Sequence, residues 1–109
     1  MVYDETLAER IRDLLDTHAD LEEKKMFGGI AFMIRGHMVV GVSGDSLMVR
    51  VGQKNYESAL AEPGVGVFGK TGSPMRGWVL AAPEIIESED DLSRWVESAV
   101  SFASTLLAK

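Results

Sequence analysis

The sequence predicts an α+β domain, a two-layer sandwich of a mostly antiparallel sheet with the terminal helices packed on it. Between Ile30 and Val51, apolar residues recur at every second position, and short Gly-, Asp- and Ser-rich turns separate the runs. Strands joined by such short turns must be antiparallel. Helical apolar spacing occurs near both ends of the chain, so helices flank the strands instead of alternating with them, as is typical of α+β domains.

The first helix is predicted from Asp4 to Thr17. Its apolar residues lie four, seven and eight positions after Leu7, which places them in one stripe along the helix. Asp4 is a suitable N-cap, and Glu5 suits the positive end of the helix dipole. The stripe consists of Leu7, Ile11, Leu14 and Leu15.

A first strand is predicted from Glu22 to Phe27, and Gly28-Gly29 forms either a bulge in one long strand or a turn between two. Three runs then follow, separated by turns at residues 35–37 and 43–46. Their alternation sends one set of side chains to the helices, namely Ile30, Phe32, Ile34, Val40, Val42, Leu47, Val49 and Val51. The other set, Ala31, Met33, Val39 and Met48 with Arg35 and Arg50, falls on the opposite face.

The second half of the chain is predicted to add a helix, two strands and a closing helix. The helix runs from Gln53 to Glu62 and is stopped by Pro63-Gly64. Strands are expected at 65–68 and 77–82, with a loop at 69–76 between them. Ser88 begins a capping-box-like sequence before a helix that runs nearly to Lys109. Its buried face is expected to contain Leu92, Trp95, Val96, Ala99, Phe102, Ala103, Leu106 and Leu107.

Length and composition indicate one ordinary globular domain over residues 1–109. Hydrophobic residues make up 46% of the chain, which is typical of such domains. No apolar run approaches the roughly 20 residues of a spanning helix, and the acidic N-terminus does not resemble a secretory signal. We therefore expect no membrane association and a cytoplasmic location. The absence of cysteine excludes disulfides and thiolate metal sites.

Charge is distributed unevenly along the chain, whose net charge is −6. Residues 24–77 carry seven basic and three acidic side chains, whereas the segments on either side are acidic. In one interpretation, the charges of the two layers only neutralise each other or keep their faces solvated. Alternatively, the sheet presents a basic surface to an anionic partner. The overall acidity makes nucleic-acid binding weak at best. The candidate interaction surface consists of Lys24, Lys25, Arg35, Arg50 and Arg76.

Residues 64–71, GVGVFGKT, match the phosphate-binding pattern G-x-x-x-x-G-K-[ST]. That pattern binds phosphate only where a loop opens a helix, but here its interior has the composition of a strand and Gly72-Ser73-Pro74 follows. The two histidines, His18 and His37, have no metal-ligand spacing. No catalytic group stands out, so we expect neither an enzyme nor a cofactor.

The apolar residues on the sheet face away from the helices suggest self-association. An exposed apolar patch usually marks an interface, and a two-fold homodimer is its symmetric solution. The candidate dimer face is Met33, Val39 and Met48, with Ala31 beside them. The alternative is that residues 53–62, or the loop at 69–76, cover this face.

Three segments resemble the N-terminal domain of the TfoX/Sxy-type competence regulators: KKMFGGIAFM at 24–33, GDSLMVRV at 44–51 and GSPMRGWV at 72–79. The resemblance implies a two-layer α+β fold similar to secretion-chaperone-like domains. In named members a second, helical domain follows and the whole protein regulates competence genes, so this chain is expected to be the first domain standing alone. The resemblance supplies no catalytic residue.

These observations together favour a small non-enzymatic module that regulates by binding a protein partner or itself. Two alternatives stay open: a nucleic-acid-associated regulator that uses the basic residues, and a binder of an unidentified small ligand.

Overall fold

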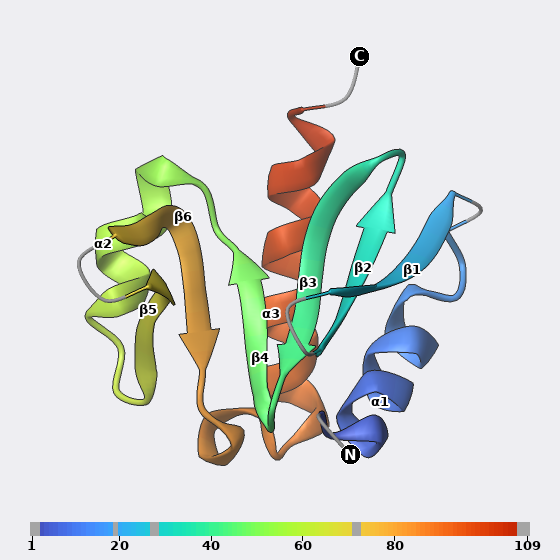
Figure 1. Ribbon diagram of the computed structural model, residues 1–109, viewed down its shortest axis with the longest axis horizontal. Coiled ribbons are helices and arrows are strands. Elements are labelled where there is room, and N and C mark those ends of the chain that lie inside the picture. The colour runs from blue at the N-terminus through green and yellow to red at the C-terminus, as the bar shows by residue number, and fades with distance from the viewer. Residues whose placement is uncertain (1–2, 19, 27–28, 71–72, 107–109) are drawn as a thin grey trace.

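The computed structural model describes residues 3–18, 20–26, 29–70 and 73–106. In this part of the chain a six-stranded sheet carries its helices on one face (Figure 1). Every strand pair is antiparallel, in the order β1-β2-β3-β4-β6-β5, so the predicted α+β sandwich is confirmed. The elements are α1 (Glu5–Leu15), β1 (Leu21–Met26), β2 (Gly29–Ile34), β3 (His37–Ser43), β4 (Ser46–Arg50), α2 (Gln53–Leu60), β5 (Val65–Lys70), β6 (Ser73–Ala81), the 3₁₀ helix η1 (Pro83–Ile86) and α3 (Glu89–Ser104).

Both predicted helix caps form. The Asp4 carboxylate accepts a hydrogen bond from the Leu7 N–H at 3.1 Å, and the Ser88 hydroxyl accepts one from the Asp91 N–H at 3.0 Å. Each cap satisfies a backbone donor that the first helical turn leaves without a partner.

The closing helix ends earlier than the sequence indicates. The Thr105 and Leu106 amides donate to carbonyls three residues back, which tightens the last turn and ends α3 at Ser104. Leu106 is therefore half-buried in a turn, so its expected place in the core is wrong. Leu107 lies outside the described residues.

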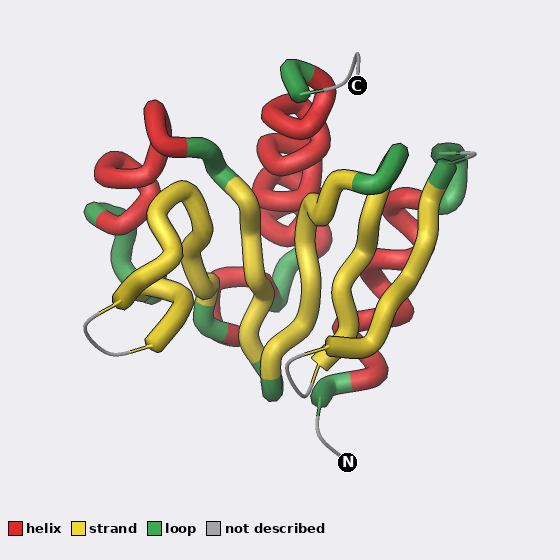
Figure 2. The backbone as a smooth tube through the Cα atoms, turned by 45° about the horizontal axis from the view of Figure 1, so that its top comes forward, coloured by secondary structure: helices red, strands yellow, loops and turns green. Residues whose placement is uncertain are grey.

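The core lies between the helices and the sheet. Figure 2 shows the helices behind the strands, and α2 lies on the same side as α1 and α3. Two buried residues of α2, Tyr56 and Ala59, belong to the same hydrophobic cluster as the inner strand residues. The fully buried side chains include Phe32, Ile11, Leu15, Leu47, Ile86, Leu92, Val40, Val42, Val49 and Val79.

A β-bulge changes the alternation in β3. Phe32 pairs with Val40, but Met33 pairs with Met38, so Val39 is an extra residue between two paired positions. Val39 is completely buried in the main core cluster, whereas the sequence pattern places it on the opposite face. That expectation was wrong because period-two counting does not register an inserted residue.

The β2–β3 hairpin has the predicted turn. Arg35 and Gly36 both have positive φ, 54° and 82°, as in the two-residue turns whose twist matches that of the flanking strands. β1 and β2 are separate strands and not one long strand, since Met26 of β1 pairs with Gly29, the first residue of β2. Gly28 lies outside the described residues.

The β5–β6 hairpin has longer strands than predicted. Gly69 pairs with Pro74 and Lys70 with Ser73, so most of the expected loop at 69–76 belongs to β5 and β6. The phosphate-loop-like segment is therefore mostly strand, as its composition indicates, and strand β6 follows it. Among the described helices, none is long and apolar enough to cross a membrane.

Candidate interaction face

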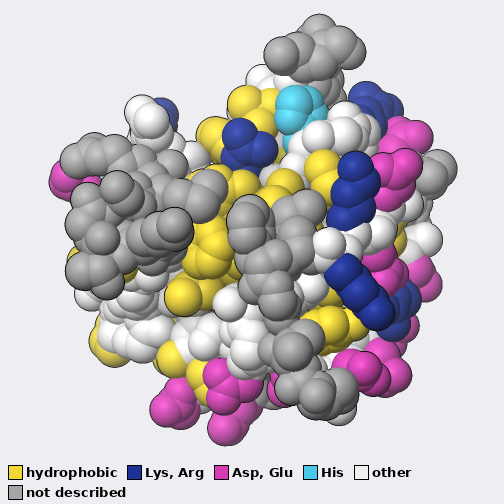
Figure 3. All heavy atoms as spheres, viewed as in Figure 1, with side chains coloured by type: hydrophobic (Ala, Val, Ile, Leu, Met, Phe, Trp, Pro, Cys, Tyr) yellow, Lys and Arg dark blue, Asp and Glu magenta, His cyan; other side chains and the backbone are white. Residues whose placement is uncertain are grey.

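The sheet face away from the helices, here called the open face, is the candidate site. Its residues follow from register: Ala31, Gly41, Met48 and Leu80 are neighbours across four strands and alternate with the core residues. Figure 3 shows this face, with hydrophobic side chains near its centre and acidic ones along the lower rim. Half-buried apolar residues on it are Met33, Met38, Phe68 and Leu80.

Two of the open-face residues are nevertheless fully buried. Ala31 and Met48 each have 0% relative exposure, yet neither belongs to the main core cluster. The end of the Met48 side chain packs against Gly41, since a Cβ placed on that glycine would lie 2.4 Å from the Met48 Cε. The expectation that Val39 and Met48 form an exposed dimer face is therefore wrong. Of the three proposed residues only Met33 reaches the surface.

The alternative that residues 53–62 cover the open face is also wrong. Helix α2 lies on the other side of the sheet, with α3. Just after α2, Glu62 forms an ion pair with Arg94 of α3 at 3.5 Å. Side chains at 73–76, part of the other proposed cover, lie outside the described part of the structure.

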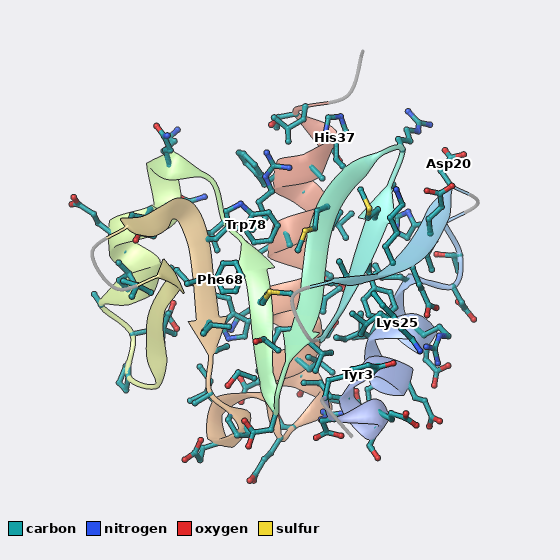
Figure 4. The ribbon with its side chains drawn as sticks, in the orientation of Figure 1. Tyr3, Asp20, Lys25, His37, Phe68 and Trp78 are labelled. Atoms are coloured by element: carbon teal, nitrogen blue, oxygen red, sulfur yellow. The ribbon has the colours of Figure 1, made fainter. Side chains whose placement is uncertain are left out.

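Arg50 is enclosed by aromatic rings where the open face meets the end of α3. Its guanidinium carbon lies 5.5 Å from the centroid of Trp78 and 5.5 Å from that of Phe102. The centroid of the Trp78 ring in turn lies 6.3 Å from that of the Phe68 ring (Figure 4). Register places Trp78 beside Arg50, on neighbouring strands. The half-buried guanidinium is therefore held by two cation–π contacts.

The other candidate basic residues do not gather around Arg50. Lys24 pairs with Ala31 and so lies on the open side of β1, whereas Lys25 pairs with the core residue Ile30 and lies on the helix side. Arg35 is exposed and forms an ion pair with Asp20 at 2.9 Å. Arg76 belongs to β6, but its side chain lies outside the described part. The described members of the predicted basic set therefore do not form one continuous surface.

Both histidines line one open cavity of about 360 Å³ beside the C-terminal end of α3. His37 and Asp20 approach it from the β2–β3 turn and the start of β1 (Figure 4), and Ser104 completes one wall. Nowhere in the described residues do three or more His, Asp or Glu side chains gather closely enough to hold a metal ion.

The sequence identified Arg50 as a candidate but did not indicate that Trp78 and Phe102 contact it. Trp78 precedes the core residue Val79, so strand alternation alone would place its ring on the open face. Phe102 was assigned to the core face of the last helix, yet it is half-buried and reaches Arg50 beyond the end of β4. No local pattern in the sequence indicates that these three side chains meet.

The fold and this face define a class of protein: a small two-layer α+β domain in which all the described helices lie on one side of an antiparallel sheet. The chain matches the TfoX N-terminal domain over residues 13–103 and belongs to that family. No curated protein is significantly similar to it.

Proposed function

We propose that this chain is a small non-enzymatic regulatory module that binds a protein partner, or a second copy of itself, through the open face. The observation that carries the proposal is the group of half-buried apolar side chains, Met33, Met38, Phe68 and Leu80, on the face that none of the described helices covers. Aromatic residues, methionine and arginine are the side chains enriched at protein interfaces.

A protein partner is favoured over a nucleic acid. The described lysines of the candidate set lie on opposite sides of β1, and Arg35 already has an acidic partner. A polyanion requires several phosphate contacts, and the net charge of −6 opposes its approach. The regulatory part of the proposal rests on membership of the TfoX N-terminal domain family.

A charge placed on the open face tests the proposal. Leu80→Glu and Met33→Glu put a carboxylate among the apolar residues, whereas Ser101→Glu puts the same charge on the exposed surface of α3. We expect the first two variants, and not the third, to lose the wild-type self-association or the capture of host proteins. Light scattering over the micromolar range and quantitative affinity capture measure these two outcomes. Equal binding by all three folded variants would refute the use of the open face.

A further inference from the structure

Arg50 differs from the other arginines whose side chains the structure describes. Arg10, Arg12, Arg35 and Arg94 each lie within 4.0 Å of a carboxylate, and within the described residues Arg50 does not. Its one hydrogen bond to a described residue runs from Nη1 to the Met38 carbonyl at 3.4 Å. Because a guanidinium carries five N–H donors, most of its donors have no partner among the described residues.

The guanidinium faces a cleft of about 360 Å³. Trp78 and Phe102 line it together with Gly52 and Gly77, whose backbones are joined by a hydrogen bond from the Gly52 N–H to the Gly77 carbonyl at 3.1 Å. Contact with aromatic faces orients an arginine while leaving the N–H groups at its edge free for hydrogen bonding. The charged group is thus held in place and half-buried, so little side-chain entropy remains to be lost on binding.

The described charges around this cleft are positive. Among the residues that the structure describes, no Asp or Glu lines it, and Lys54 lies one residue beyond the lining residue Gln53, in the first turn of α2. A half-buried cation without an acid beside it attracts an anion more strongly than a solvated one does. The cleft is therefore a local exception in a chain whose net charge is negative.

We propose that the Arg50 cleft binds a carboxylate carried by the protein segment that docks on the open face. A carboxylate is planar, carries one charge and accepts two parallel hydrogen bonds from one guanidinium. Trp78 and Phe102 contact the apolar atoms that adjoin this carboxylate. A phosphate dianion would suit the cleft less well because, among the described lining residues, Arg50 is the one cation. The inference rests on the proposed function, since it names the chemistry by which the partner is recognised.

The test uses the isolated chain labelled with ¹⁵N and three small probes at equal ionic strength. N-acetyl-leucine carries the carboxylate, N-acetyl-leucinamide is its neutral counterpart, and inorganic phosphate is the competing anion. The indole N–H of Trp78 and the Nε–H of Arg50 report binding. The indole of Trp95, which is 3% exposed in the core, is the internal reference and shows whether each variant is folded.

We expect N-acetyl-leucine to shift the Trp78 and Arg50 signals saturably, in the millimolar range typical of a single small contact. The amide and phosphate should bind at least about tenfold more weakly, and Arg50→Gln should weaken N-acetyl-leucine binding by at least about tenfold. Arg35→Gln, which removes an exposed arginine already paired with Asp20, should bind like the wild type.

Equal shifts with acid and amide, tighter binding of phosphate, or unchanged binding in a folded Arg50→Gln variant would each overturn the proposal. The measurement needs no partner, so it can fail while the open-face variants still lose partner capture. Conversely, carboxylate binding can be found even if capture is unaffected by Leu80→Glu. The two proposals are therefore separable.

Discussion

The guanidinium of Arg12 on α1 donates hydrogen bonds to both carboxylate oxygens of Glu23 on β1, reaching Oε1 at 2.9 Å. This hydrogen bonding lowers the pKa of Glu23, and burial opposes the shift only in part. Because β1 is an edge strand, the pair links the first helix to one edge of the sheet.

Replacement of Glu23 by Gln should reduce stability in a pH-dependent way. Since the pKa of Glu23 is lower in the folded chain, the pair stabilises the fold fully above the pKa of the unfolded chain and loses this effect as pH falls through the folded value. Both side chains are partly exposed, so we expect a loss of at most about 1 kcal/mol at pH 7. Urea denaturation at neutral and acidic pH measures it.

Glu22→Gln is the matched control for this pair. Glu22 is exposed on the other side of β1 and has no ion pair among the described residues. If the Glu22 and Glu23 variants lost equal stability at pH 7, the interaction with Arg12 would not be the cause.

A charge at Val49 should abolish the folded state. Val49 is 0% exposed in β4, so Val49→Asp would bury a carboxylate without a partner, which costs several kcal/mol. Val67 on the edge strand β5 is 52% exposed, and Val67→Asp should melt near the wild-type temperature. Leu106→Asp should have an intermediate effect because Leu106 is half-buried. Circular dichroism melting compares the three, and a wild-type melt for Val49→Asp would contradict the strand register.

Gly41→Ala should destabilise the chain by about 1–3 kcal/mol. A Cβ at this position would lie 2.4 Å from the Met48 Cε and 2.7 Å from the Ile30 carbonyl oxygen. The methionine can move, but the backbone oxygen is held in the sheet. Gly66→Ala, in β5, meets nothing within 4 Å and should be nearly neutral. Chemical denaturation of the two alanine variants measures the difference, and equal stability would show that the sheet adjusts at Gly41.

ATP and GTP with Mg²⁺ should leave the melting temperature unchanged. Residues 65–70 are paired with β6 as a strand, so the Lys70 segment does not open a helix where phosphates bind. Thermal melts of the wild type and Lys70→Ala with each nucleotide check this. A rise in the wild type that disappeared in Lys70→Ala would establish a nucleotide site.

The sequence by itself determined the helices, the central hairpins and most of the core. The capping side chains of Asp4 and Ser88 act within three residues, and the turn at Arg35-Gly36 depends on local backbone conformation. Alternation along β4 correctly placed Val49 in the core. These features are local, so a pattern of neighbouring residues contains the information that specifies them.

Only the tertiary structure decided which open-face residues are accessible and which side chains meet. The bulge at Val39 depends on how β3 pairs with β2, and the position of the Met48 Cε beside Gly41 is possible because glycine has no Cβ. Arg50, Trp78 and Phe102 come from β4, β6 and α3 and meet only once the sheet and helix are packed. Strand pairing and helix packing join residues far apart in the chain, so no local spacing in the sequence records these contacts.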